Sequence, residues 1–158
     1  MEEFMRYSSP FLIPFLLFSF ICIAGVPVNE VNRDEVLNAG PEWKEKYDTY
    51  QPDPDRIEAL KSKLGDVRID IYLGLWCPDS RNNVPPFIKT LEATGLSVPV
   101  RFLSMERKPG KEVRYYSDKF EVEKVPTFIF YRSDREIGRI VENPKTGLLE
   151  DTIEILSR

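Results

Sequence analysis

The stretch Leu75-Trp76-Cys77-Pro78-Asp79-Ser80-Arg81, LWCPDSR, directly follows an apolar run from Val67 that is typical of a buried strand. A helix is predicted after Cys77, reaching to about Thr94. The cysteine then lies at a strand-to-helix junction, where unpaired backbone N–H groups and the helix dipole favour negative charge. Because the thiolate is the reactive form of cysteine, Cys77 is a candidate nucleophile, and the Ser80 hydroxyl could donate to its sulfur.

Strands and helices alternate along the rest of the chain. Asp53 and Pro54 are suited to the cap and the first position of a helix that Gly65 ends. Ser133-Asp134 indicates a hairpin turn. The predicted strands span residues 67–75, 98–105, 127–131 and 136–141, and the predicted helices residues 54–64, 78–94, 111–120 and 146–156. This order predicts an α/β fold, with a mixed central β-sheet flanked by helices on both faces.

An N-terminal helical extension is predicted over residues 25–52, before a main domain over residues 53–158. Residues 25–33 are expected to form a flexible lead, and Asp34 to cap a short helix that Gly40-Pro41 ends. Trp43, Tyr47 and Tyr50 then recur at helical spacing, which stacks three aromatic rings on one face. We expect this face to dock the extension on the domain; a ligand-binding stripe is the alternative.

The first 24 residues are predicted to be a signal peptide. Phe11 to Val26 is almost wholly apolar, but it is short for a membrane span, and Cys22-Ile23-Ala24 provides a small-residue end for cleavage after Ala24. We therefore expect an exported protein, periplasmic or secreted. An uncleaved membrane anchor and a lipid-modified Cys22 are the alternatives. Cleavage would leave Cys77 as the last cysteine, so that no intrachain disulfide could form.

Composition excludes several classes of function. The 158 residues carry a formal net charge of −4 and include no histidine. Hydrolysis by a Ser-His-Asp or Cys-His arrangement is thus excluded, and a zinc enzyme is disfavoured. There is no basic stripe of the kind that nucleic acid requires, and no glycine-rich phosphate loop. No metal site and no cofactor are predicted.

Several features of the sequence resemble those of the thioredoxin-like superfamily. Trp76-Cys77-Pro78-Asp79-Ser80 resembles W-C-x-x-C with serine in the last place, and Pro85 stands where thioredoxins carry a proline in their active-site helix. Lys124-Val125-Pro126-Thr127 is similar to the segment whose cis proline faces the active cysteine. Residues 136–141 resemble the last strand of that family. The resemblance covers about residues 55–158 and implies a thioredoxin-like fold.

The resemblance also implies roles for six residues. Cys77 would be the catalytic nucleophile, with Ser80 in the place of the resolving cysteine. Val125 would offer backbone hydrogen bonds to an extended substrate, beside a cis Pro126, and Trp76 and Pro78 would form the surface around the thiol.

Two departures from the thioredoxin pattern decide the predicted function. Ser80 replaces the second cysteine, and Ile71 stands where thioredoxins have a buried acid, with Asp70 adjacent on the other face of the strand. A mixed disulfide on Cys77 must then be resolved by an outside thiol. The sequence predicts a monothiol oxidoreductase, isomerase-like in its thiol–disulfide exchange; the alternative is a non-catalytic binding or client-retention module. Its partners would be protein clients with thiols or disulfides, or low-molecular-weight thiols, with no nucleic acid, and a membrane only through an uncleaved N-terminus.

Overall fold

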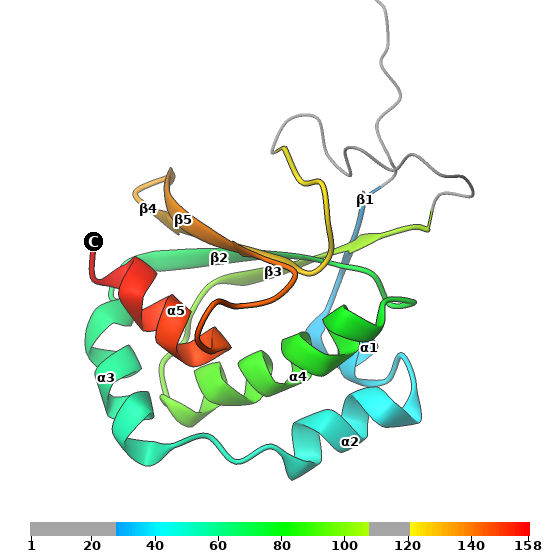
Figure 1. Cartoon of the computed structure of the whole chain (residues 1–158), viewed down its shortest axis with the longest axis horizontal. Coiled ribbons are helices and arrows are strands. Elements are labelled where there is room, and N and C mark those ends of the chain that lie inside the picture. Colours follow the sequence, from blue (N-terminus) through cyan, green and yellow to red (C-terminus); the bar gives the residue numbers. More distant parts are fainter. Residues whose placement is uncertain (1–27, 108–120) are drawn as a thin grey trace, which may run out of the picture.

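The computed structural model describes residues 28–107 and 121–158, and five strands within them form one sheet (Figure 1). The strands are Val28–Val31 (β1), Val67–Leu73 (β2), Val100–Met105 (β3), Thr127–Arg132 (β4) and Arg135–Val141 (β5). Their order in the sheet is β1-β3-β2-β4-β5. β2 and β3 are parallel, and the other neighbours are antiparallel. The predicted mixed sheet is confirmed, but the helices of the described residues cover one face of it and not both. The predicted signal peptide and the predicted helix over residues 111–120 lie outside the described residues.

The helices of the described residues all lie on one face of this sheet (Figure 1). They are Arg33–Leu37 (α1), Pro41–Thr49 (α2), Pro54–Leu64 (α3), Pro78–Ala93 (α4) and Leu148–Leu156 (α5). Side chains from every one of them join a single apolar core against this face. A second, smaller cluster with Tyr72, Leu103 and Ile129 lies on the other face. None of these helices has the length and apolarity that crossing a membrane requires.

Sequence signals account for where α3 begins and ends. The Asp53 side chain accepts hydrogen bonds from the backbone N–H groups of Asp55 and Arg56, which would otherwise lack partners in the first turn. Pro54 occupies the first helical position, and Gly65 ends the helix at φ +25°. Each of these expectations is confirmed.

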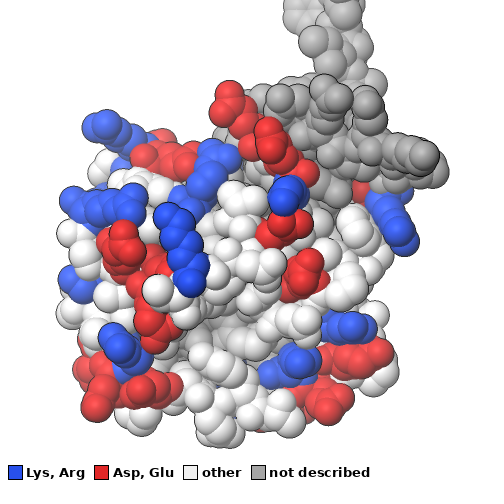
Figure 2. Space-filling model, viewed as in Figure 1, with Lys and Arg blue, Asp and Glu red and all other residues white. Residues whose placement is uncertain are grey.

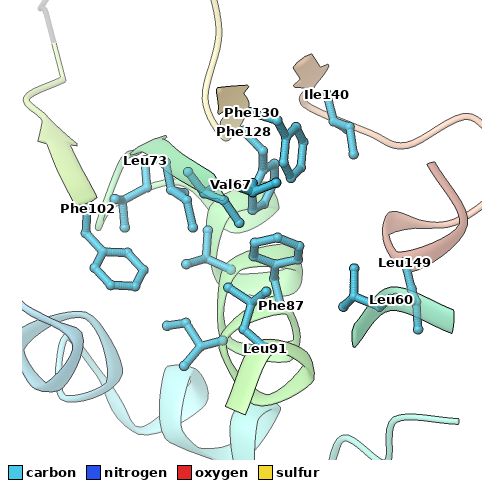
Figure 3. Close-up of a cluster of buried hydrophobic side chains, with 14 of the residues drawn as sticks. Leu60, Val67, Leu73, Phe87, Leu91, Phe102, Phe128, Phe130, Ile140 and Leu149 are labelled. Carbon is cyan, nitrogen blue, oxygen red and sulfur yellow. The ribbon is translucent and has the colours of Figure 1, made fainter. Parts of the chain in front are cut away.

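α4 crosses the core and starts at the motif that contains the cysteine. Its middle is fixed by Phe87, whose ring packs edge-on against Phe128 and Phe130 of β4, with centroid distances of 5.0 and 6.3 Å (Figure 3). The helix continues through Pro85 and Pro86, although each proline lacks a backbone donor. The packing of Phe87 therefore sets the position of the helix over the sheet.

The N-terminal extension differs from its prediction in two places. Residues 28–31, expected in a flexible lead, form strand β1, which pairs with β3 and becomes an edge of the sheet. The residue that caps α1 is Asn32 rather than Asp34, because the Asn32 side chain accepts from Glu35 N–H while the Glu35 carboxylate accepts from Asn32 N–H. A strand this short and polar carries no clear alternation, so the chain alone did not reveal it.

Two of the three aromatic residues of the extension, Trp43 and Tyr47, dock it on the domain as expected. Trp43 is buried in the core and Tyr47 packs against it, whereas Tyr50 lies just beyond the end of α2. Residues 28–49 thus contribute a strand and part of the core. The domain boundary at residue 52 stays a prediction.

Candidate functional site

Cys77 is held at the N-terminus of α4 by backbone contacts on both sides. It is the N-cap residue, its N–H donates to the Gly74 carbonyl at 2.9 Å, and its carbonyl accepts from Arg81 N–H at 3.1 Å. Its thiol donates to the Val125 carbonyl at 3.4 Å. The side chain is 7% exposed and forms no disulfide. The sulfur therefore lies just below the surface, against the segment that enters β4.

The Val125–Pro126 peptide bond is cis, as predicted, and it lies beside Cys77. Further hydrogen bonds hold this segment. Thr127 Oγ1 donates to the Lys124 carbonyl at 2.7 Å, and Glu142 N–H donates to the Pro126 carbonyl at 2.7 Å. The second bond joins the start of β4 to the end of β5. The geometry brings Val125 and Pro126 to the cysteine, and their role in substrate binding stays a prediction.

Ser80 is fully buried, and its hydroxyl accepts a hydrogen bond from Gly74 N–H at 3.1 Å. This contact ties the first turn of α4 to the loop that precedes it. Within the described residues, no hydrogen bond joins Ser80 to the sulfur of Cys77; the thiol is directed to Val125 instead. Ser80 thus acts as a structural contact in the place of a resolving cysteine.

Gly74 is a residue of this site that the sequence analysis missed. Its N–H donates to Ser80, its carbonyl accepts from Cys77, and a Cβ atom at this position would come within 2.8 Å of the Trp76 ring. Glycine allows the indole to lie against the backbone of its own loop. The signal was a lone glycine two residues before the tryptophan, where a strand ends.

Trp76 and Pro78 are exposed on either side of the buried cysteine. Trp76 is 40% exposed, and its Nε1 donates to the Met105 carbonyl at 2.9 Å, which fixes the ring at the end of β3. The Arg107 guanidinium lies over this ring, 5.5 Å from its centroid. Pro78 occupies the first position of α4, where its missing N–H costs nothing. The exposed indole provides an apolar surface next to the thiol.

The two charged residues that follow Cys77 in the sequence, Asp79 and Arg81, differ in their contacts. Arg81 pairs with Glu42 of α2, with 3.5 Å between Nη1 and Oε1. Asp79 lies in the first turn of α4 without an ion pair among the described residues. Acidic and basic side chains are interspersed over the face shown in Figure 2, and they do not gather there into a basic patch.

Asp70, which is adjacent to the position where thioredoxins have a buried acid, is not available for proton transfer. Ile71 belongs to the helix-side core, and Asp70 lies buried on the opposite face of β2. Burial alone would raise the pKa of Asp70, but hydrogen bonds from Arg101, at 2.9 and 2.5 Å, and from Arg68, at 2.7 Å, outweigh it and lower that pKa. Asp70 is therefore an ionised structural group.

Comparisons with known proteins relate the chain to one family. No curated protein matches the chain. Among solved structures, the crystal structure of thioredoxin from Aeropyrum pernix is 23% identical, with 63% of this chain and 82% of that chain covered and a TM-score of 0.40. A family model described as thioredoxin matches residues 28–149, which include β1 and both helices of the extension. Since this match covers most of the chain, the protein belongs to the thioredoxin family.

Proposed function

We propose that the protein exchanges thiols and disulfides through a single cysteine, Cys77, in a compartment outside the cytoplasm. Thiol–disulfide chemistry in general follows from membership of the thioredoxin family. The observation that carries the proposal is the position of Cys77: it caps α4, with its sulfur 3.4 Å from the carbonyl of the residue before the cis proline. Cys77 thus lies at the start of a helix, against the segment that would bind an extended client.

The proposed reaction needs one sulfur of the protein. The Cys77 thiolate attacks one sulfur of a disulfide, a new S–S bond forms, and the other half of the disulfide leaves with the electron pair as a thiolate. Ser80 cannot reverse this step, because its hydroxyl is not a nucleophile at neutral pH and already accepts from Gly74. A thiol from outside must attack the adduct, reforming the Cys77 thiolate and a new disulfide.

The proposed partners are protein clients with thiols or disulfides and low-molecular-weight thiols. An extended client would lie along Val125 and Pro126 and cover the exposed ring of Trp76 and the ring of Pro78. Location outside the cytoplasm rests on the apolar run of residues 11–26 and its small-residue end. A compartment with oxidised thiols would supply the disulfides that such a protein meets.

A binding module without catalysis is the second candidate, and the burial of the cysteine favours it. Cys77 is 7% exposed, and its thiol donates to the Val125 carbonyl. Burial and this hydrogen bond both hinder the attack of a reagent on the sulfur. In this case the surface around Trp76 would bind clients without a covalent step.

Trapping the adduct separates the two candidates. The full chain carrying Cys22→Ser, so that Cys77 is the one thiol left, is incubated with oxidised glutathione, quenched with acid and analysed by intact mass. We expect one glutathione per chain, and none after Cys77→Ala. A Cys22→Ser protein that stays unmodified while folded, yet reacts when unfolded, would contradict exchange and support the binding module. Location is tested separately by N-terminal sequencing of native protein, where we expect a chain that starts at Gly25.

A further inference from the structure

The ion pair between Arg81 and Glu42 lies at the reactive end of α4. α2 and α4 lie side by side with their starts at the same end of the molecule (Figure 1). Glu42, in the first turn of α2, meets Arg81, while Lys89 further along α4 donates to the Asp48 carbonyl at the end of α2, at 2.9 Å. The N-terminal extension thus brings a carboxylate to the first turns of the helix that Cys77 caps.

Arg81 is one helical turn from Cys77. Its N–H donates to the Cys77 carbonyl at 3.1 Å, so Arg81 stands in the first turns of the helix that Cys77 caps. The pair with Glu42 is loose, at 3.5 Å, and both side chains remain in contact with water, with exposures of 35% and 56%. An exposed pair of this kind is weak, so a competing anion can replace the carboxylate at little cost.

We propose that Arg81 recognises an anionic group on the thiol or disulfide that reacts with Cys77, and that Glu42 of the extension competes for it. This inference rests on the proposed function and adds a substrate class, disulfides and thiols that carry a carboxylate. In the free protein Glu42 holds the guanidinium. In the encounter complex a substrate carboxylate takes its place, while the Cys77 thiolate attacks one sulfur and the other half leaves as a thiolate.

Other charges around the cysteine act on the same substrates, and the test must separate them. Asp79 in the first turn of α4 repels an anion, and Arg107 over the Trp76 ring attracts one. Lys124 is paired with Glu142 at 2.6 Å. All of these groups are kept in every variant.

The test uses two aromatic disulfides of similar size and different charge. Dithiobis(nitrobenzoate) carries two carboxylates, and dithiodipyridine carries none. Second-order rate constants are measured at low salt on the full chain with Cys22→Ser, alone and with Glu42→Gln, Arg81→Gln or both. The ratio of the anionic to the neutral rate removes any common change in the reactivity of the thiol.

We expect Glu42→Gln to raise this ratio about 2- to 4-fold, the size that one charge at about 7 Å produces in a water-like medium. Arg81→Gln should lower the ratio by a similar factor. When Arg81 is already glutamine, Glu42→Gln should leave the ratio unchanged. All of these effects should shrink at high salt. Asp48→Asn is the matched control, since it removes a carboxylate that pairs with Lys44 on the same helix, and it should leave the ratio unchanged.

Two results would overturn the inference alone. One is an equal rise from Glu42→Gln when Arg81 is already glutamine, which would assign the effect to the field of Glu42 itself. The other is the same rise from Asp48→Asn, which would assign it to net charge. A parent protein that reacts with neither reagent would overturn the proposed function as well.

Discussion

The two ends of α4 are held by different kinds of contact. At the C-terminal end, the carboxylate of Glu92 accepts from Arg33, at 2.5 Å, and from the hydroxyl of Tyr47, so that both helices of the extension meet it. At the N-terminal end, Cys77 and Ser80 are held by backbone groups of Gly74 and Val125. The charged pair between the extension and this end of α4, Glu42 with Arg81, is longer, at 3.5 Å.

The two ends of α4 therefore have different roles: the C-terminal end anchors the extension, and the N-terminal end holds the candidate site. Charged side chains fasten the extension at the far end, away from Cys77. Backbone groups position the cysteine and the serine, leaving the charged side chains of the first turns able to change partners. A substitution at the far end should therefore change stability without changing the thiol, and a substitution at the near end should change both.

The largest effect on stability is expected in the middle of α4, where the packing of Phe87 holds the whole helix on the sheet. Phe87 is 1% exposed and packs against two phenylalanines of β4. Phe87→Ala should lower the free energy of unfolding by about 3–5 kcal/mol, because it removes buried apolar surface and leaves a cavity. Urea unfolding measures the loss. A change below about 1 kcal/mol would show that α4 is not fixed by this packing.

An intermediate effect is expected at the near end. Ser80→Ala leaves the buried N–H of Gly74 without its acceptor and should cost about 1–3 kcal/mol. Ser62→Ala is the control, because its exposed hydroxyl on α3 donates to a backbone carbonyl and should change stability by no more than about 0.5 kcal/mol. Ser80→Ala should also shift the indole N–H resonance of Trp76 in an NMR spectrum, since Gly74 contacts that ring. Equal effects of the two substitutions would remove the structural role of Ser80.

The smallest effect is expected at the far end. Burial alone would raise the pKa of Glu92, but hydrogen bonds from Arg33 and Tyr47 outweigh it and lower that pKa. Glu92→Gln should cost about 0.5–1 kcal/mol at neutral pH, a small value because the carboxylate is partly exposed. It should not change the rate at which Cys77 reacts.

The pH dependence of this loss follows from the lowered pKa. The stability that Glu92 contributes is fully present above pH 4.5, the ordinary pKa of a glutamate. It disappears as the pH falls through the lower pKa of the folded state. Parent and Glu92→Gln should therefore converge in acid. Glu154→Gln, which removes a carboxylate in an exposed pair with Arg158, is the control and should change stability by no more than about 0.5 kcal/mol. A difference between parent and Glu92→Gln that is independent of pH would contradict the anchoring role of this charge.

Local signals in the sequence were sufficient for most of the fold. Asp53, Pro54 and Gly65 bound α3 through contacts within a few residues, and the alternation of strands and helices with a late hairpin predicted a mixed sheet. β1 could not be predicted in this way, since Val28–Val31 forms a strand only because the edge of β3 is free to pair with it.

The residues of the site and one of its contacts were predictable, but its other contacts were not. The motif around Cys77 and the segment before β4 are far apart in sequence, and the resemblance to thioredoxins brought them together correctly. The direction of the Ser80 hydroxyl depends on where the Gly74 backbone lies, and the partner of Arg81 comes from another helix. Such contacts depend on tertiary packing, which the local sequence does not encode.

The lifetime of the mixed disulfide on Cys77 tests the central claim most directly. The Cys22→Ser protein and its Ser80→Cys variant are loaded with glutathione, freed of excess reagent, and followed by intact mass without any added thiol. We expect the adduct to persist with Ser80 until an external thiol is added, and to be lost quickly from Ser80→Cys, as a disulfide between positions 77 and 80 forms and glutathione leaves as a thiol. Loss of glutathione from the Ser80 protein at the rate of the variant would contradict an exchange that depends on one sulfur.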